Sequence, residues 1–422
     1  MLQPLEADLV RRDDALPALA TVLDPEAFVG ALRPSLDATE VRQASIRYLR
    51  YKPGSSCLVA YQLEVGAAQL EPLIAYAKAH RLDAPEKLDK ARRSGGAVLR
   101  DRALVISLFP NDRQLDAMRP LASAAARPRL LRRLLSRQPD LWTGTVRTLR
   151  YKPERRYVAQ LQTRDGPRAL LKVHSLERYQ RAARSAKVFG SGESVRVPRR
   201  LGASKRHRTV ALEWLPGRPL DEAIISGAAD VGTTATVGAA IAQLHNQRLP
   251  RGLPTLDRNS EAVGLISLGA DIGFVCPELA GAARRLAAWL AAHLVSRSDH
   301  CRAIHGDFNA GQVLLDGDRV TVFDLDRAAL GDPTADLGMF IAHLERDVLR
   351  GALAPDRMAA LAEGLLEGYA EAASRPAPAP VRLYTALGLL RLALEPFRAR
   401  ESDWPEKIEA LLARAAAIAE AG

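Results

Sequence analysis

The sequence predicts an α+β fold in which antiparallel β-structure comes first and a mostly helical part follows. The pentapeptide LRYKP occurs twice, at Leu49–Pro53 and at Leu149–Pro153, and alternating, strand-like runs surround each copy. After about residue 220 the apolar residues instead recur at helical spacing, as Val237, Ile241 and Leu244 do in TVGAAIAQLHNQ. The change of period marks the boundary between the two kinds of structure.

The surroundings of the two pentapeptides share one order of elements. Each copy has a strand, a Pro-led turn, a second strand, a further turn and a third strand that ends near a lysine, Lys78 or Lys172. A charged segment suited to a helix and then a strand pair follow in both copies. We therefore interpret residues of about 40–120 and 145–220 as duplicated β-lobes, with coincidence as the alternative. Lys78 is expected to have a structural role.

Composition limits the classes of partner. The net charge of +11 comes from scattered arginines that fit solvated helix faces, and no aromatic clusters suggest base stacking. No apolar run is long enough to span a membrane, and the first residues lack the apolar region of a secretion signal. Three distant cysteines are expected to be reduced and buried. We expect a cytoplasmic protein without nucleic-acid or membrane partners, and the sequence leaves the oligomeric state open.

The stretch Ala303–Gly338, AIHGDFNAGQVLLDGDRVTVFDLDRAALGDPTADLG, carries the chemistry. Its two short apolar runs flank Asp-Gly-Asp, which predicts a tight hairpin turn. Asp307 precedes the hairpin, Gln312 opens it and Asp324 ends its second strand, so the three side chains are expected at one end of a ribbon. Phosphoryl transfer needs a carboxylate base and oxygen ligands for Mg²⁺, and in a known pattern the amide ligand lies five residues after the base. Gln312 stands five residues after Asp307.

This stretch resembles the catalytic core of the aminoglycoside phosphotransferase and choline kinase-like family, relatives of the protein kinases. HGDFNAGQVLL is similar to its catalytic loop, and VFDLDRAALGDPTADLG is similar to its metal-binding segment. The resemblance implies a bilobal protein-kinase-like fold with an antiparallel β N-lobe and a mostly helical C-lobe. The extra β-lobe resembles the cap of maltokinase-like sugar kinases. We expect a cap at residues 1–130, a nucleotide-binding lobe at 131–220 and a C-lobe at 221–422.

The resemblance also implies the site. Asp307 would be the catalytic base, with His305 supporting its loop, and Gln312 and Asp324 would bind Mg²⁺. Asp336 would hold backbone amides under the site. The expected nucleotide contacts are Lys172 at the α- and β-phosphates, Arg155 or Arg156 in a glycine-free turn, and the backbone of Glu213, Trp214 and Leu215 at the adenine. The acidic partner of Lys172 stays open between Glu177, which is favoured, and Glu193.

The expected activity is ATP- and Mg²⁺-dependent phosphorylation of a hydroxyl on a small acceptor, with a sugar, aminosugar or aminoglycoside favoured. Two departures from the family pattern keep an alternative open: Gln312 stands where asparagine is usual, and the turn KPERR has no glycine. The alternative is a pseudokinase that binds nucleotide without turnover. His245 is expected to be a packed histidine, and a set of acidic residues would meet an amine or else belong to solvated helix surface: Glu363, Glu367 and Glu395.

Overall fold

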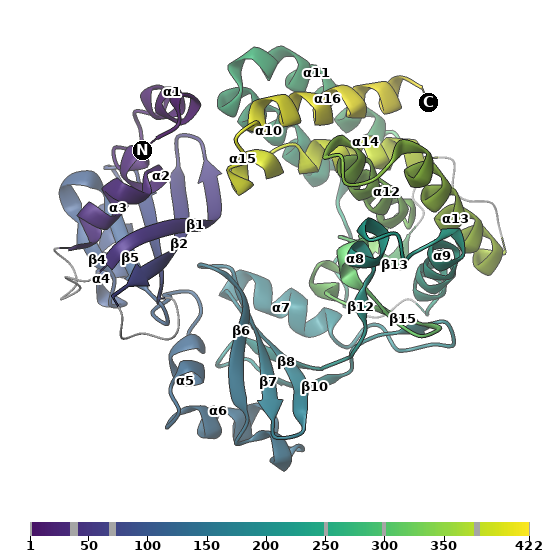
Figure 1. Cartoon of the computed structure of the whole chain (residues 1–422), viewed down its shortest axis with the longest axis horizontal. Coiled ribbons are helices and arrows are strands. Elements are labelled where there is room, and N and C mark those ends of the chain that lie inside the picture. Colours follow the sequence, from purple (N-terminus) through teal and green to yellow (C-terminus); the bar gives the residue numbers. More distant parts are fainter. Residues whose placement is uncertain are drawn as a thin grey trace.

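The computed structural model describes residues 2–33, 41–66, 73–248, 252–297, 301–374 and 380–421. Figure 1 shows three parts arranged in a ring: an N-terminal sheet with short helices, a second sheet, and a large C-terminal part that is mostly helical. The predicted change from β-structure to helices therefore occurs where the apolar period changes. After residue 220 the described strands are short.

The N-terminal part opens with three short helices, α1 (Pro4–Arg12), α2 (Leu19–Leu23) and α3 (Pro25–Leu32). Its five-stranded antiparallel sheet has the order β1-β2-β3-β5-β4. Helix α4 (Pro85–Arg93) separates the third strand from the last two. The strands are β1 (Val41–Lys52), β2 (Ser56–Val65), β3 (Leu73–His80), β4 (Ala97–Leu99) and β5 (Leu104–Leu108).

The second sheet repeats this plan. Helices α5 (Met118–Ala122) and α6 (Arg127–Leu134) precede it, and its strand order is β10-β11-β8-β7-β6. Helix α7 (Leu176–Ser185) follows the third strand, as α4 does in the first sheet. Its strands are β6 (Thr145–Lys152), β7 (Arg156–Thr163), β8 (Gly166–His174), β10 (Arg200–Ser204) and β11 (Thr209–Glu213).

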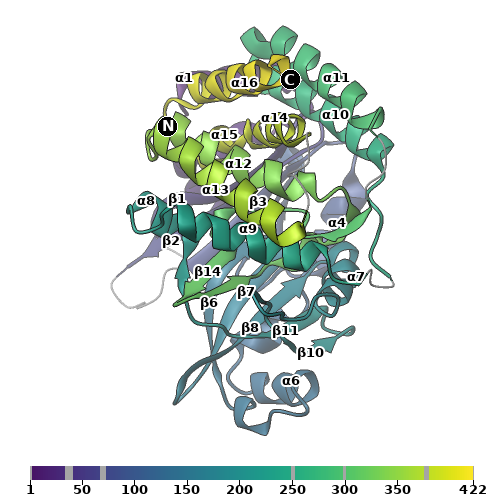
Figure 2. The ribbon, with the colours of Figure 1, turned by 90° about the vertical axis from the view of Figure 1, so that its right-hand side faces the viewer.

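The C-terminal part surrounds a small β-ribbon. The hairpin of β14 (Val313–Asp316) and β15 (Arg319–Val322) pairs with β12 (Arg218–Pro219) and β9 (Val195–Arg196), and β13 (Arg302–Ile304) pairs with β16 (Ala329–Gly331). Figure 2 shows α9 and α13 lying side by side over this ribbon. The helices are α8 (Leu220–Ile225), α9 (Val231–His245), α10 (Arg258–Val275), α11 (Ala280–Val295), α12 (Thr334–Leu349), α13 (Pro355–Ala373), α14 (Val381–Leu392), α15 (Glu395–Ala399) and α16 (Trp404–Glu420).

Several predicted details of this part are confirmed. Val237, Ile241 and Leu244 are fully buried on one side of α9. Asp316 pairs with Arg319 across the predicted hairpin turn, and Gly317 between them takes a positive φ of 57°. Helices α9 and α13 approach closely because glycines face backbone atoms: a Cβ on Gly368 would stand 2.0 Å from the carbonyl oxygen of Ala235.

The two sheets agree in detail as well as in strand order. Lys78 pairs with Leu58 on β2, and Lys172 pairs with Val158 at the corresponding place on β7. His80 and His174, two residues further on, each donate their backbone N–H to a carbonyl in the following hairpin, at 2.9 Å. The domain boundaries and the role of the first sheet as a cap stay predictions.

The repeated pentapeptide has a physical explanation in two buried aspartates. The Tyr51 hydroxyl and the Gly54 N–H both donate to Asp13, at 2.6 and 2.9 Å. In the second copy, the Tyr151 hydroxyl and the Glu154 N–H donate to Asp112, at 2.9 and 2.8 Å. Each aspartate therefore ties the strand before the turn to the turn itself. The repeat thus begins well before the strands, a feature the sequence comparison missed.

The turn after each pentapeptide differs in one residue that joins the two sheets. Gly54 and Glu154 occupy equivalent turn positions with positive φ values of 61° and 59°. A non-glycine residue is strained there, so the glutamate needs compensation. Its carboxylate receives Lys78 at 2.5 Å, Arg113 at 2.7 Å and Arg50 at 3.2 Å. Lys78, the counterpart of Lys172, thus anchors the turn of the second sheet to the first.

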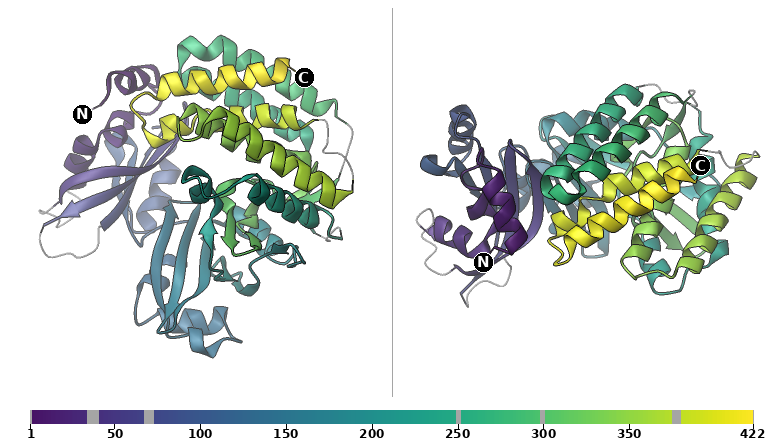
Figure 3. Two further views of the ribbon diagram at one scale, coloured as in Figure 1. Left: turned by 45° about the vertical axis from the view of Figure 1, so that its right-hand side comes forward. Right: turned by 90° about the horizontal axis from the view of Figure 1, so that it is seen from above.

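The other side of the N-terminal part packs against the C-terminal helices. Leu9, Tyr51 and Trp404 belong to one continuous apolar core that includes residues of β1, β2, α10, α11, α14 and α16. A buried ion pair joins Arg400 to Glu6 at 2.9 Å, and Arg400 also donates to the carbonyl of Leu23. Figure 3 shows this contact between the first helices and the C-terminal ones. The N-terminal part is therefore held on two sides.

Two further features bear on the sequence expectations. Across the part of the chain that the structure describes, no helix combines the length and apolar character needed to cross a membrane. Cys57 and Cys276 are buried as expected, but Cys301 is exposed, so the expectation of burial was wrong for that residue. Cys301 comes directly before the short strand β13, whose later residues Ala303 and Ile304 are buried.

We predict that Glu154→Gln weakens the attachment of the second sheet to the first. Burial alone raises the pKa of Glu154, but Lys78 and Arg113 outweigh it and lower the pKa to about 2. Removing one partner from a buried ion network costs about 3–5 kcal/mol. Urea unfolding followed by tryptophan fluorescence at neutral pH measures this loss.

The pH dependence has a definite sign. A carboxylate whose pKa falls on folding stabilises the protein above its unfolded-state pKa and loses that contribution as the pH falls through its folded value. Between about pH 4.5 and 2, the unfolding free energy should therefore depend less on pH in the variant than in the wild type. Glu64→Gln, an exposed position on β2, is the control. Equal stability of wild type and Glu154→Gln at neutral pH would contradict the anchoring role.

Candidate active site

The β14–β15 hairpin places the catalytic-loop residues beside the metal-segment residues. The loop 305–312 leads into β14, and the segment 323–327 leaves β15. The Phe323 N–H donates to the carbonyl of Gln312 at 3.0 Å, which extends the ladder by one step. Gln312 and Asp324 therefore emerge at the same end of the ribbon, as the sequence predicted.

Asp336, at the start of α12, holds the catalytic loop from below. Its carboxylate accepts the backbone N–H groups of His305 at 2.7 Å and Gly306 at 2.8 Å, and its third partner is the ring of His245 at 2.9 Å. These bonds match the expectation that Asp336 holds backbone amides. His245 is fully buried between Asp336 and the Tyr369 hydroxyl, so it is a packed histidine, as expected.

His305 lies beneath the loop with no exposed surface. Its Nε2 atom is 2.9 Å from the carbonyl oxygen of Phe323, which links the catalytic loop to the metal segment. Burial and this bond give the side chain a supporting position, and its role stays a prediction.

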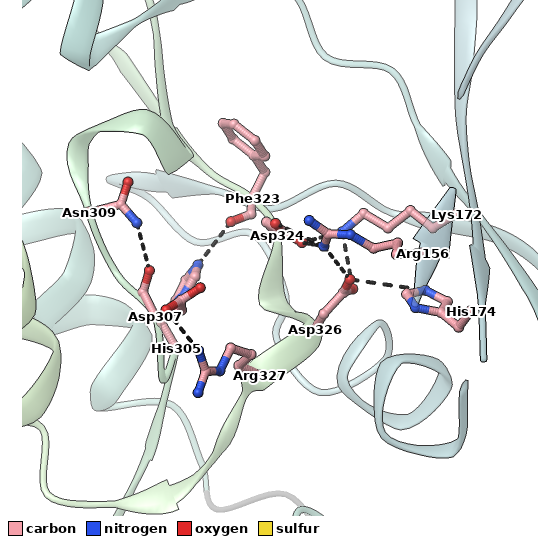
Figure 4. A network of polar contacts seen from close by, with 10 residues as sticks. All are labelled: Arg156, Lys172, His174, His305, Asp307, Asn309, Phe323, Asp324, Asp326 and Arg327. Carbon is pink, nitrogen blue, oxygen red and sulfur yellow. Dashed lines mark hydrogen bonds and ion pairs between the residues drawn. The ribbon is translucent and has the colours of Figure 1, made fainter. Parts of the chain in front are cut away.

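Asp307 points toward solvent rather than into the core, and Figure 4 shows it beside Arg327. The Arg327 guanidinium donates to its Oδ1 atom at 3.2 Å. Asn309 donates to the backbone carbonyl of Asp307 and accepts the N–H of Gly311, which fixes the loop around Asp307. The carboxylate is thus held at the pocket but remains accessible to an acceptor.

Lys172 reaches the same place from the second sheet. On β8 the neighbours Leu171 and Val173 face the core formed with α5 and α6, so strand alternation directs Lys172 to the opposite face. Its ammonium lies 2.6 Å from Asp324 and 3.0 Å from Asp326. Figure 4 shows this contact between the sheet and the C-terminal part.

The preference for Glu177 as the acidic partner of Lys172 was therefore wrong. Glu177 lies on the exposed side of α7, and the described carboxylates that bind Lys172 are Asp324 and Asp326. Helix α7 begins directly after β8, which leaves Glu177 too close in the chain to turn back toward the lysine. Asp326, the second carboxylate of the segment 323–327, binds Lys172 instead of Glu177.

Arg156 completes this ion cluster. Its guanidinium donates to Asp324 at 2.8 Å and to Asp326 at 2.8 Å. Burial by itself would raise the pKa of Asp324, but Lys172 and Arg156 hold it below its ordinary value. Burial likewise lowers the pKa of the neighbouring His174 to about 4, so this histidine is neutral at physiological pH.

The two groups of residues face one pocket of about 550 Å³. Asp307 and Arg327 lie on one side of it, and Asp324 and Asp326 on the other. The described residues around it are Lys152, Arg155, Arg156, His174, Glu177, Arg178, Arg181, Ala182, Asp307, Asp324, Asp326 and Arg327. Arg155 and Arg156, both expected at the phosphates, line this pocket.

The donor atoms of Gln312 and Asp324 fit the metal site that the sequence predicts. The Oε1 atom of Gln312 is buried without a hydrogen-bond partner, and Asp324 offers a carboxylate at the same end of the ribbon. An orphaned amide oxygen beside a carboxylate fits a hard cation such as Mg²⁺, which takes few protein ligands. Among the described residues no group of three or more His, Cys, Asp or Glu side chains forms a metal site, so the nucleotide phosphates would have to supply further oxygens.

The expected adenine segment connects the second sheet to the C-terminal part. Glu213 ends β11, Trp214 donates its N–H to the carbonyl of Arg168, and Leu215 is buried. The Glu213 side chain lies 3.5 Å from Arg196 and is not needed for a backbone contact with a base. These three residues are not among the described residues that line the pocket at Asp307, which separates the expected adenine end from the phosphate end.

Sequence reasoning missed several pocket residues, among them Arg327, Arg178 and Arg181. Arg327 follows Asp324 by three positions, and a left-handed φ of 64° at Asp324 starts the short helical turn that carries it. Arg178 and Arg181 are one helical turn apart on α7, a spacing that signals a common face. Nothing in the sequence shows that this face meets the pocket.

Comparison with known proteins gives the fold an independent test. A family model described as the phosphotransferase enzyme family matches residues 145–384, more than half of the chain. A comparison with curated proteins finds no match.

Several solved structures are similar to this chain. A choline kinase from Cryptosporidium parvum Iowa II has 10% identity and a TM-score of 0.50, covering 71% of this chain and 96% of that one. The GDP complex of aminoglycoside 2'-phosphotransferase-IIIa has 16% identity and a TM-score of 0.47, covering 69% and 98%. A macrolide 2'-phosphotransferase from Brachybacterium faecium has 23% identity and a TM-score of 0.41, covering 64% and 91%. The predicted kinase-like fold is confirmed.

We predict that Asp336→Asn loosens the catalytic loop. The buried carboxylate accepts two backbone N–H groups and a histidine, and a hydrogen bond to a charged group contributes about 1.5–3 kcal/mol. Amide hydrogen exchange at His305 and Gly306 should become faster, with a lower unfolding free energy. Asp318→Asn, in the exposed hairpin turn, is the matched control. Unchanged exchange at both amides would show that the loop does not depend on Asp336.

Proposed function

Because the chain belongs to the phosphotransferase enzyme family, we propose that it transfers the γ-phosphate of ATP, in the presence of Mg²⁺, to a hydroxyl group of a small molecule. One observation carries the proposal. Asp307, Asp324 and Lys172 come from a loop, a hairpin and a separate sheet, and the pocket of about 550 Å³ brings the two aspartates together beside the lysine. If these charges served only to stabilise the fold, a carboxylate as accessible as that of Asp307 would not be needed.

The base acts on the acceptor. Asp307 accepts the proton of the acceptor hydroxyl as that oxygen forms a bond to the γ-phosphorus, and the bond from this phosphorus to the bridging oxygen breaks to release ADP. Asn309 and Asp336 fix the loop, so the carboxylate of Asp307 is already oriented toward the acceptor hydroxyl and little entropy is lost on reaching the reactive geometry. Arg327 donates to the Asp307 carboxylate at 3.2 Å and so helps to hold it at the pocket.

The remaining residues bind the nucleotide. We assign Lys172, Arg155 and Arg156 to its phosphates, and the backbone of Glu213, Trp214 and Leu215 to the adenine. Gln312 and Asp324 would hold Mg²⁺, which neutralises charge on the transferred phosphoryl group when bound. In the present arrangement Lys172 and Arg156 neutralise Asp324 and Asp326 instead. A bound metal would neutralise these carboxylates instead, so Lys172 and Arg156 would be available to the phosphates.

A small hydroxylated acceptor, such as a sugar, aminosugar or aminoglycoside, fits the proposal. The acidic residues considered for an amine lie elsewhere: Glu363 and Glu367 are exposed on α13, and Glu395 pairs with Arg346 at 3.2 Å. These residues are therefore helix surface rather than part of the pocket at Asp307, as the alternative interpretation held.

We predict that Asp307→Asn lowers turnover by about 10²–10⁴-fold, because the amide cannot accept the hydroxyl proton. Nucleotide affinity should change little, since the described contacts of Asp307 do not include Lys172 or Arg156. Coupled detection of ADP gives the rate, and titration calorimetry with ADP gives the affinity. Asp316→Asn, exposed on the same hairpin, is the control. Unaltered turnover would mean that another group is the base.

We predict that Asp324→Ala removes the effect of Mg²⁺ on nucleotide binding. The variant keeps Asp326 as a partner for Lys172, so the lysine is not left buried alone. Binding of ADP with and without Mg²⁺, measured by calorimetry, should give equal affinities in the variant and different ones in the wild type. An unchanged response to Mg²⁺ would exclude Asp324 as a ligand.

The pseudokinase alternative makes an opposite prediction for the wild type. It requires Mg-ATP binding without ADP release for any acceptor in a panel of sugars, aminosugars, sugar acids, sugar phosphates and aminoglycosides. The longer arm of Gln312 motivates it, whereas the buried and unpaired Oε1 atom favours a functional ligand.

A further inference from the structure

The pocket at Asp307 holds more positive charge than its own carboxylates neutralise. Arg156 pairs with Asp324 and Asp326, and Arg327 pairs with Asp307. Among the described residues, Lys152, Arg155, Arg178 and Arg181 line the same pocket without an ion pair to a carboxylate. Such a group of cations around one pocket is typical of a site for anions.

Two of these cations lie on the side of the base. Arg181 donates to the backbone carbonyl of Arg327, whose own guanidinium binds Asp307. Arg178 precedes Arg181 by three residues on α7, so both side chains share one face of the helix. The acceptor hydroxyl must approach Asp307. A substituent near that hydroxyl therefore meets Arg178 and Arg181.

The nucleotide has separate partners. Lys172, Arg155 and Arg156 come from the second sheet and its turn, and Lys172 and Arg156 already gather around Asp324 and Asp326. Neither Arg178 nor Arg181 of helix α7 takes part in that ion cluster. The triphosphate thus binds the cations of the second sheet, and Arg178 and Arg181 of the helix stay available for another anion.

The pKa shifts of Arg178 and Arg181 agree with an anion site. Burial, and then the neighbouring Arg327, lower the pKa of both Arg178 and Arg181. Burial and three nearby arginines also lower the pKa of Lys152 to about 8. Cations that destabilise one another gain most when an anion enters between them.

We infer that the acceptor is anionic: Arg178 and Arg181 bind a phosphate or carboxylate group that it carries near the hydroxyl to be phosphorylated. This inference rests on the proposed phosphotransfer and narrows it to sugar phosphates or sugar acids. A polyamine such as an aminoglycoside would bring further positive charge to Arg178, Arg181 and Arg327. The bidentate guanidinium suits both anions, because each presents paired oxygens.

The kinetic test compares acceptors with one carbon skeleton. Glucose, glucosamine, glucuronate and glucose 6-phosphate are each supplied with Mg-ATP to the full-length protein, and ADP release is measured. The two anionic acceptors should give kcat/KM values at least about tenfold above glucose, and glucosamine should fall below it. Comparison of glucuronate with glucose 6-phosphate distinguishes carboxylate from phosphate. Preference for glucose or glucosamine would overturn the inference.

The double variant Arg178→Gln with Arg181→Gln tests the residues. The KM for the anionic acceptor should rise about ten- to a hundred-fold, while the KM for ATP stays within about twofold. Arg184→Gln, an exposed position on the same helix away from the pocket, is the matched control. A larger rise in the KM for ATP than in that for the acceptor would assign both arginines to the nucleotide and refute the inference.

A binding experiment decides the case in which no acceptor of the panel turns over. Inorganic phosphate is titrated into the wild type saturated with Mg²⁺ and a non-hydrolysable ATP analogue, which fills the γ-phosphate position. Binding that the double variant loses and Arg184→Gln keeps would support the anion site. Absence of phosphate binding by the analogue-saturated wild type would overturn it and leave the proposed phosphotransfer standing. Failure to bind the Mg-nucleotide itself would instead overturn the proposed function.

Discussion

The ion cluster between the second sheet and the hairpin is the interaction on which the site depends. Lys172 and Arg156 come from strands of one part, and Asp324 and Asp326 come from the other. Neither the two cations nor the two carboxylates would be stable alone in this mostly buried place, since an isolated buried charge is costly. Under the proposed function, these four charges would rearrange, with a metal on Asp324 and phosphates on the cations. The ion cluster already brings the second sheet and the hairpin together.

The two sheets show how one structural position acquires two uses. Lys78 and Lys172 occupy equivalent places, but the first meets the carboxylate of a turn and the second meets the metal segment. The turn residue that reaches Lys78 is Glu154, where the first copy has Gly54. In the first sheet, the place beside this lysine is thus filled by Glu154 from the second sheet. The contact between Glu154 and Lys78 fixes the turn that carries Arg155 and Arg156 relative to the first sheet, and Arg156 fixes it relative to the hairpin.

The sequence was sufficient for features set by local pattern. The hairpin around Gly317, the core face of α9 and the succession of strands and helix along each copy follow from period and turn chemistry. The partner of Lys172 was missed because it depends on where α7 begins and on the left-handed turn at Asp324. Asp13 and Asp112 were missed because each lies nearly forty residues from the tyrosine that it binds, and no local signal connects them.

Charge explains why the N-terminal part matters to the pocket as well as to stability. Tyr48 of β1 lies 6.0 Å below the ammonium of Lys152, so a ring of the first sheet faces a cation of the second. Cations held close together repel, and this aromatic face offsets part of that repulsion at Lys152. The ion pairs of Glu154 with Lys78 and Arg113 tie the turn before Arg155 and Arg156 to the N-terminal part. The first sheet therefore helps to position the turn that brings these two cations to the pocket.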